Sequence, residues 1–293
     1  MPTTPYVSAA AFRAHPTYLD TDGLRVGNPD PADQTAALTT LLLEASAWAD
    51  NECDQPLGAH VRIQRCRAMV DRSGNLKWHA DHGPVLAVNS VGYGLAPTAL
   101  TTVAGTGAWV ENDTNIVLPI GGQNTAWSGS LQFGLPLSGE VFVLASITAG
   151  FVATVLAEAS TAGATSLTVA DPTGIVPGGE YRIWEPGAEE TVTVSPLWVP
   201  PAPTVPVIPT ALLLAAPTVN AHEGGHDFSS LPADARNAIV QKVTATLMRP
   251  DSAAEDEFPN TALGSDTRKS DPRNGSGLIA AAARTLASYG RVR

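Results

Sequence analysis

Charged side chains are scarce in this 293-residue chain, where Asp, Glu, Lys and Arg make up only 15% of the sequence. The scarcity suggests that much of the surface is buried against partners, although codon bias towards Ala, Gly and Pro is an equally good explanation. Basic residues are especially few, with 17 Lys and Arg against 28 Asp and Glu, and the net charge is −11. Because binding to phosphates needs clustered Lys and Arg, this balance argues against a basic nucleic-acid reader.

Cysteines and long apolar runs are also few. Cys53 and Cys66 give neither a disulfide framework nor metal-ligand spacing, so we expect free thiols in a protein made in a reducing cytoplasm. The opening MPTTPYVSAAAFR lacks the basic start and apolar block of a signal peptide. The uncharged stretch 141–157 is interrupted by Gly150 and rich in Val, Ile and Thr, so it predicts two buried strands joined at Ala149-Gly150 rather than a membrane span.

Helical patterns are confined to the two ends of the chain. The strongest covers 30–53, where Asp30 suits the N-cap, Pro31 suits the first helical position, and apolar residues recur at helical spacing. Three further helices are predicted: 8–14 with Ser8 as its cap, a helix from Leu231 that Pro250 ends, and 278–289 with Gly290 at its C-terminus. Residues 251–276 are acidic and then mixed, without an apolar period, and predict a mobile loop.

The middle of the chain is rich in Val, Thr, Gly and Pro and follows a period of two. Strands are predicted at 60–70, 85–93, 115–120, 166–169, 181–184 and 191–194, with a hairpin turn at 71–75 and a polar loop at 121–129. The proline-rich stretch 196–209 fits neither sheet nor helix and predicts an extended arm. The sequence therefore predicts an α+β fold, in which 1–58 and 228–293 form a helical core and 59–227 form a large inserted β-rich module.

The segment HEGGH, from His222 to His226, matches the HExxH motif of zinc proteases. That motif works because a helix places both imidazoles one turn apart on one face, with the glutamate beside the metal-bound water. Here two consecutive glycines cost about 1 kcal/mol each inside a helix, no apolar stripe supports the segment, and no third ligand is evident. We therefore predict a turn with no metal and no catalytic residue, and keep a zinc hydrolase using His222, Glu223 and His226 as a remote alternative.

Two other polar clusters have structural explanations. His79, Asp81 and His82 could supply metal ligands, but a polar turn after a strand explains them equally well. Glu189 and Glu190 precede a Thr-Val-Thr-Val strand and fit a charged sheet edge better than a catalytic pair. No GxSxG motif and no phosphate-binding glycine loop occurs. We therefore expect a protein that is not an enzyme and that needs no cofactor.

Three stretches of the sequence carry a family resemblance. They are the opening YVSAAAFRAHPTYLDTDGLR with the helix ADQTAALTTLLLEASAWADNECDQPLG, the β segment AGATSLTVADPTGIVPGGEYRIWEPGAEETVTVS, and the stretch APTVNAHEGGHDFSSLPADARNAIVQKVTATLMR. With the strand region after the first helix they cover about two thirds of the chain, and they resemble head-tail connector (adaptor) proteins of tailed phages, most of all phages of actinobacteria. The shared features are turns and apolar stripes, without a catalytic signature.

The resemblance implies a virion structural protein of the neck region, made in the host cytoplasm. Such subunits form a ring, usually a dodecamer, beneath the portal protein; they lengthen the DNA channel and offer a surface for the tail or stopper protein. Double-stranded DNA passes without sequence-specific binding, and no membrane is involved. Since the C-terminal tail of the family often reaches into the portal, the candidate portal contacts are Leu278, Leu286, Tyr289, Arg291 and Arg293.

The resemblance also suggests contacts between subunits. We expect the proline arm, through Trp198, Pro200 and Pro201, to contact a neighbouring subunit, and residues 251–267 to become ordered only on assembly. The long middle, 60–226, departs from the smaller adaptors and is expected at the periphery or tail-facing side of the ring. A tail terminator or tail-completion protein, which would also form a ring, is the alternative.

Overall fold

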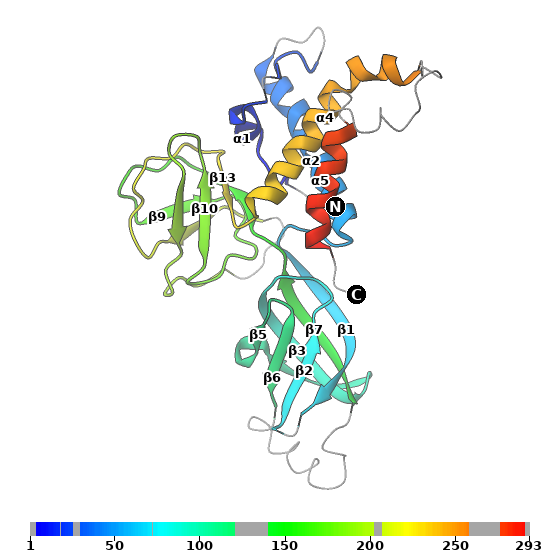
Figure 1. Cartoon of the computed structure of the whole chain (residues 1–293). Helices are drawn as coiled ribbons and strands as arrows, with labels where there is room; N and C mark the ends of the chain where they lie inside the picture. The colour runs from blue at the N-terminus through cyan, green and yellow to red at the C-terminus, as the bar shows by residue number, and fades with distance from the viewer. Residues whose placement is uncertain are drawn as a thin grey trace. The chain divides into compact units, whose positions relative to one another are not determined.

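The computed structural model describes residues 4–17, 19–25, 30–71, 73–120, 140–201, 207–257 and 276–290 (Figure 1). Its helices are α1 (Ala9–Ala14), α2 (Pro31–Cys53), α4 (Ala233–Glu257) and α5 (Ser276–Leu286), with the 3₁₀ turns η1 (Gly105–Gly107) and η3 (Ala287–Tyr289). Its strands are β1 (His60–Val70), β2 (Asn75–His79), β3 (Val85–Ala96), β4 (Ala99–Ala104), β5 (Trp109–Glu111), β6 (Asn115–Pro119), β7 (Glu140–Ala149), β8 (Ala153–Val155), β9 (Ser166–Val169), β10 (Glu180–Trp184), β11 (Glu190–Thr193), β12 (Thr210–Leu213) and β13 (Asp227–Ser229).

The chain divides into two compact units. One holds residues 59–151, and the other combines residues 1–58 with residues 152–290. The sequence analysis placed a boundary at 227/228, whereas the inserted unit ends at Phe151. Residues 152–227 therefore belong with the two chain ends.

The inserted unit is a curled antiparallel sheet of seven strands in the order β4-β3-β7-β1-β2-β6-β5 (Figure 1). Alternation along the strands turns one set of side chains inwards, because successive residues of a strand point to opposite faces. The inward side chains of several strands form a single core that includes Trp78 on β2, Tyr93 on β3, Ile116 on β6 and Ile147 on β7. The predicted strands at 60–70, 85–93 and 115–120 and the hairpin turn at 71–75 are confirmed.

The second unit contains two small sheets. Four strands pair in the order β11-β10-β13-β8, and β12 pairs with β9. The predicted strands at 166–169, 181–184 and 191–194 are confirmed to within a residue. The apolar stretch 141–157 does form two strands, β7 and β8, separated at Gly150, whose φ of +104° favours glycine.

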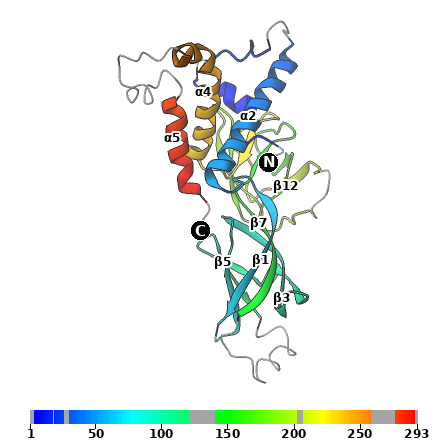
Figure 2. The same cartoon turned by 90° about the vertical axis from the view of Figure 1, so that its right-hand side faces the viewer.

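Three helices of the same unit pack together. In both views α2, α4 and α5 lie side by side (Figures 1 and 2), and each pair of them is in contact. The shared interior includes Leu38, Leu42, Ile239 and Leu286, all without exposed surface. The helix at 30–53 begins as predicted, with the Asp30 side chain accepting a hydrogen bond from Ala32 N.

The predicted α+β fold built on a helical core is wrong, because the protein is mainly β. Helices account for only about 27% of it and do not form a dominant core. The error has a physical cause. Apolar residues at helical spacing are easy to detect over a long helix, whereas three-residue strands such as β8 and β13 are too short to show alternation, so the helical content was given too much weight.

Two predicted helix ends also differ. The helix from residue 231 does not end at Pro250 but continues to Glu257, so part of the predicted 251–276 loop is helical. The last helix ends in a 3₁₀ turn, and Gly290 after it has φ −61° rather than the left-handed conformation of a glycine cap. The residues between these two helices, 258–275, lie outside the described part of the chain. None of the described helices is long and apolar enough to cross a membrane.

Candidate functional site

The HEGGH segment is a turn before β13, as the sequence predicted, and not a helix. Gly225 has φ +88°, and its N–H donates to Leu156 O at 2.7 Å. His222 exchanges backbone hydrogen bonds with Ser160, its N–H donating at 2.9 Å and its carbonyl accepting at 2.8 Å. The backbone of the turn is therefore fixed against residues 156–160. The zinc-protease arrangement of two imidazoles one helical turn apart does not occur here.

A buried histidine lies between two carboxylates at this turn. The His222 side chain has no exposed surface; its Nδ1 lies 2.8 Å from Glu185 Oε2 and its Nε2 lies 3.2 Å from Glu190 Oε1. Glu185 and Glu190 are themselves only 13% and 10% exposed. Burial in a low dielectric strengthens such contacts, so the three side chains hold one another in place.

Glu190 has a structural role that the sequence analysis missed. Its Oε2 accepts hydrogen bonds from Val219 N at 2.9 Å and Asn220 N at 3.1 Å, which fixes the loop that leads to the HEGGH turn. Glu189, by contrast, points outwards and forms an exposed ion pair with Arg182. The adjacent glutamates thus differ: only Glu189 matches the predicted charged edge.

Asp227, directly after the turn, connects three segments of the chain. Its Oδ1 accepts from Ser8 N, the N-cap of α1, at 2.9 Å, and its Oδ2 lies 2.6 Å from Arg236 Nη2 on α4. The Arg236 guanidinium also lies over the Trp184 ring, 4.6 Å from its centroid. The residue that follows the HEGGH segment is therefore a structural junction between the small sheet and the helices.

A cleft of about 370 Å³ opens beside this junction. Its lining comes from α1, α4 and the turn after β10, and includes Trp184, Glu189, Arg236 and His15. Most of the remaining lining residues are alanine, valine and proline. The cleft holds no pairing of a nucleophile with a general base, and it gives no support to a catalytic role.

The predicted histidine cluster at 79–82 does not converge. His79 Nδ1 lies 3.0 Å from Asn115 Oδ1, Asp81 binds Arg62, and His82 Nδ1 lies 3.0 Å from His60 Nε2. Each side chain is thus committed to a different neighbour. Within the described ranges these residues do not form a metal site.

The predicted subunit-contact residues form a surface that is partly anchored. Trp198 is 7% exposed and its Nε1–H donates to Ala211 O at 3.1 Å, whereas Pro200 and Pro201 are exposed. The residues on either side of Trp198 are among the most exposed apolar ones described: Leu197 is 84% and Val199 is 81% exposed. Residues 202–206 of the arm lie outside the described part.

The predicted portal-contact residues differ in accessibility. Leu286 is fully buried in the helical layer, where its carbonyl accepts from Cys53 Sγ at 3.3 Å. Leu278 is half-buried, and Tyr289 donates its hydroxyl to Asp234 Oδ1 at 2.6 Å. Arg291 and Arg293 lie outside the described residues.

A second exposed apolar surface lies on the outer face of β1. Val61, Ile63 and Met69 are 51%, 68% and 50% exposed, and they alternate with inward-facing residues. Arg65 and Arg67 lie on the same face, since they have the same parity along the strand. The sequence analysis recognised the strand but gave this face no role.

Comparison with other proteins adds no identification. No protein-family model matches the chain, and no curated protein matches it.

Proposed function

We propose that this chain is a structural subunit of the virion neck of a tailed phage: a head-tail connector that forms a ring beneath the portal. In this proposal the chain is not an enzyme. Its partners are further copies of itself, in a ring expected to be a dodecamer, together with the portal protein and the tail or stopper protein. The subunit would be made in the host cytoplasm. The resemblance to connector proteins is the starting point, and the surface of the molecule supports it.

The observation that carries the proposal is the segment Leu197-Trp198-Val199. The buried Trp198 fixes the backbone, and its two neighbours then present large aliphatic side chains to the solvent. A fixed, exposed apolar pair gives a monomer no stability, but it gains roughly 1.5–3 kcal/mol per side chain when a partner covers it. A neighbouring subunit is the occupant we propose.

Ring assembly needs two different contact faces on each subunit, because a head-to-tail ring joins unlike surfaces. The arm residues Leu197 and Val199 belong to one compact unit, and the β1 residues Val61 and Ile63 belong to the other. The chain therefore has two separate apolar surfaces. The net charge of −11 also suits a channel through which DNA passes without binding, since like charges repel.

The test is co-assembly of the purified chain with the portal protein of its phage, imaged by electron microscopy. We expect rings stacked coaxially under the portal. Rings on tail tubes without portal binding would instead assign the chain to tail completion. A chain that binds neither portal nor tail tube, and that forms no rings, would refute the neck proposal.

A variant tests whether the arm, and not another part of the surface, makes the contact between subunits. The double substitution Leu197→Ser and Val199→Ser should abolish ring formation and leave the melting temperature unchanged, because both side chains are exposed. Leu95→Ser is a control, since Leu95 is 55% exposed but lies on the inserted unit, near the end of β3. Normal rings from the double variant would show that the arm is not a subunit contact.

A further inference from the structure

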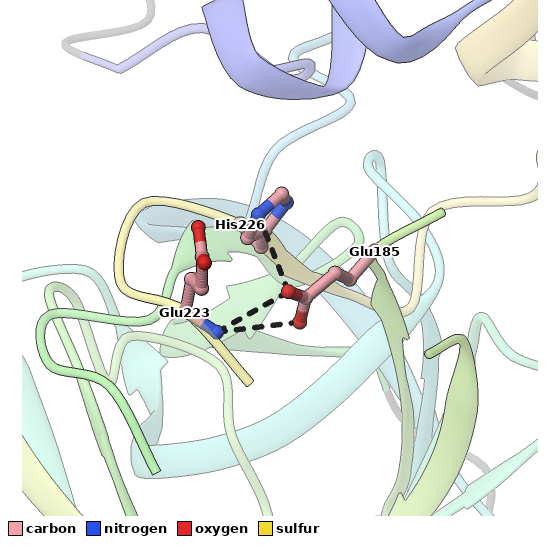
Figure 3. A group of neighbouring side chains, drawn as sticks. All are labelled: Glu185, Glu223 and His226. Atoms are coloured by element: carbon pink, nitrogen blue, oxygen red, sulfur yellow. Dashed lines mark hydrogen bonds and ion pairs between the residues drawn. The ribbon is translucent and has the colours of Figure 1, made fainter. Parts of the chain in front are cut away.

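We propose that Glu185, Glu223 and His226 bind one divalent transition-metal ion, with Zn²⁺ as the metal that this donor set favours. Each residue offers one ligand atom, and these atoms all lie within 4.8 Å of one another (Figure 3). Glu185 follows β10, whereas Glu223 and His226 belong to the turn before β13. Two of the three proposed ligands, Glu223 and His226, belong to the HEGGH segment. The third, Glu185, precedes His222 by 37 residues and was not recognised from the sequence.

One buried polar atom of the proposed ligands, His226 Nδ1, has no hydrogen-bond partner. Two other buried atoms nearby, His222 Nε2 and Glu190 Oε1, face each other at 3.2 Å. His226 Nε2 is also poorly satisfied, at 3.5 Å from Glu185 Oε1. Leaving a buried polar atom unpaired costs about 1–3 kcal/mol, so a metal ion bound by the His226 imidazole would recover part of that cost.

The surrounding residues hold Glu185 in position to coordinate. His222 Nδ1 is 2.8 Å from Glu185 Oε2, and Glu223 N donates weakly to both oxygens at 3.3 and 3.4 Å. Hydrogen bonds of this kind orient metal-binding carboxylates in known sites. In Figure 3 the Glu185 carboxylate points towards His226 and towards the backbone of Glu223.

The turn itself brings the other two ligands together. Gly225 has φ +88°, a backbone conformation that residues with a Cβ atom rarely adopt, and this allows the chain to reverse between Glu223 and His226. Backbone hydrogen bonds to Leu156 hold the His226 end of the turn: Gly225 N donates to Leu156 O at 2.7 Å, and Leu156 N donates to His226 O at 2.9 Å. The backbone on which Glu223 and His226 stand is therefore fixed before binding.

One imidazole and two carboxylates suit Zn²⁺ better than Ca²⁺ or Mg²⁺, which prefer oxygen ligands. Three protein ligands leave a fourth position for water. The ion would connect the end of β10 to the turn that precedes Asp227, and would thus brace the junction between the small sheet and the helices. This role depends neither on ring assembly nor on any enzymatic activity.

The experiment uses the full chain, treated with a chelator and dialysed, and then titrated with Zn²⁺. Metal analysis should give one Zn²⁺ per chain, and at about 100 times the dissociation constant the melting temperature should rise by roughly 5 °C. Ca²⁺ and Mg²⁺ at the same concentration should give no shift. Failure of the wild-type chain to bind Zn²⁺ at about one equivalent would refute the proposal.

Variants locate the site. Glu223→Gln and His226→Ala should each remove the Zn²⁺-induced shift; Glu223 is exposed, so its variant should fold normally. His79→Ala removes a histidine of the other unit, and Glu158→Gln changes a carboxylate that accepts a hydrogen bond from Thr168 Oγ1 at 3.5 Å and is not one of the three proposed ligands; both variants should bind Zn²⁺ as the wild type does. Zn²⁺ binding by Glu223→Gln and His226→Ala with unchanged affinity and shift would refute the assignment.

Discussion

Arg236 Nη2 lies 2.6 Å from Asp227 Oδ2, and the two side chains are only 9% and 3% exposed. This buried ion pair connects α4 to β13, and the other Asp227 oxygen accepts from Ser8 N. Sequence distance conceals the relationship, because the N-terminus, the turn before β13 and α4 meet at one carboxylate. The stability of the larger unit should therefore depend strongly on this pair.

Asp227→Asn should destabilise the unit by about 3–5 kcal/mol, because it leaves the buried Arg236 guanidinium without a counter-charge. The measurement is urea unfolding at pH 7 followed by circular dichroism. Glu189→Gln is the control: its ion pair with Arg182 is 40–46% exposed, so its loss should cost less than about 1 kcal/mol. Equal losses of unfolding free energy in the two variants would show that the buried Asp227–Arg236 pair stabilises the protein no more than an exposed ion pair does.

Local signals in the sequence predicted individual elements well. The cap at Asp30 with Pro31 specified the start of α2, and strict alternation specified β1 from His60 to Val70. Two adjacent glycines correctly indicated a turn at His222–His226, because glycine disfavours helix. These signals depend only on neighbours within a few residues.

Relationships between distant segments were not predictable in this way. β7 and β8 are neighbours in the chain but belong to different sheets, and the three-residue β13 joins its sheet only through pairing with β8 and β10. Glu185 likewise reaches the HEGGH turn only because β10 pairs with β13. The pairing of strands, and not their propensity, determines both the mainly β architecture and the candidate metal site.

Close packing at Gly105 predicts that a single added methyl group, as in Gly105→Ala, lowers the stability of the inserted unit strongly. A Cβ atom at Gly105 would lie 1.9 Å from Val88 O, a backbone atom of β3 that cannot move aside alone. Gly105→Ala should therefore destabilise the inserted unit by about 2 kcal/mol or more, measured by urea unfolding. Gly23→Ala, where no atom lies within 4 Å, should change stability by less than about 0.5 kcal/mol. Similar stabilities of the two variants would contradict the close approach at Gly105.

Both thiols should react slowly in the native protein. Burial, with a contribution from Asp50, raises the pKa of Cys53 to about 12, and burial with Asp81 raises that of Cys66 to about 11. At pH 8 the thiolate fractions are then on the order of 10⁻⁴ and 10⁻³, and only the thiolate reacts with a disulfide reagent. Titration with an aromatic disulfide should show both thiols reacting slowly in buffer and rapidly in 6 M guanidinium. One equivalent of thiol that reacts rapidly in buffer would contradict this expectation. Loss of that reaction in Cys66→Ser would identify Cys66 as the reactive thiol, and its persistence would identify Cys53.

Tyr6 should make the protein sensitive to alkaline pH. Burial, together with the Asp50 carboxylate that accepts its hydroxyl at 2.7 Å, raises the pKa of Tyr6 far above its usual value of 10. The unfolded state therefore loses this proton first, so the stabilising contribution is complete below pH 10 and declines as pH rises further. One retained proton corresponds to about 1.4 kcal/mol per pH unit. Tyr6→Phe should accordingly lower the free energy of unfolding at pH 7, because the hydrogen bond to Asp50 is lost. Between pH 10 and 12 the free energy of unfolding of the variant should fall less steeply with pH than that of the wild type, by up to about 1.4 kcal/mol per pH unit. Urea midpoints measured across this range test it, and an unchanged slope would mean that Tyr6 does not hold its proton more tightly in the folded state.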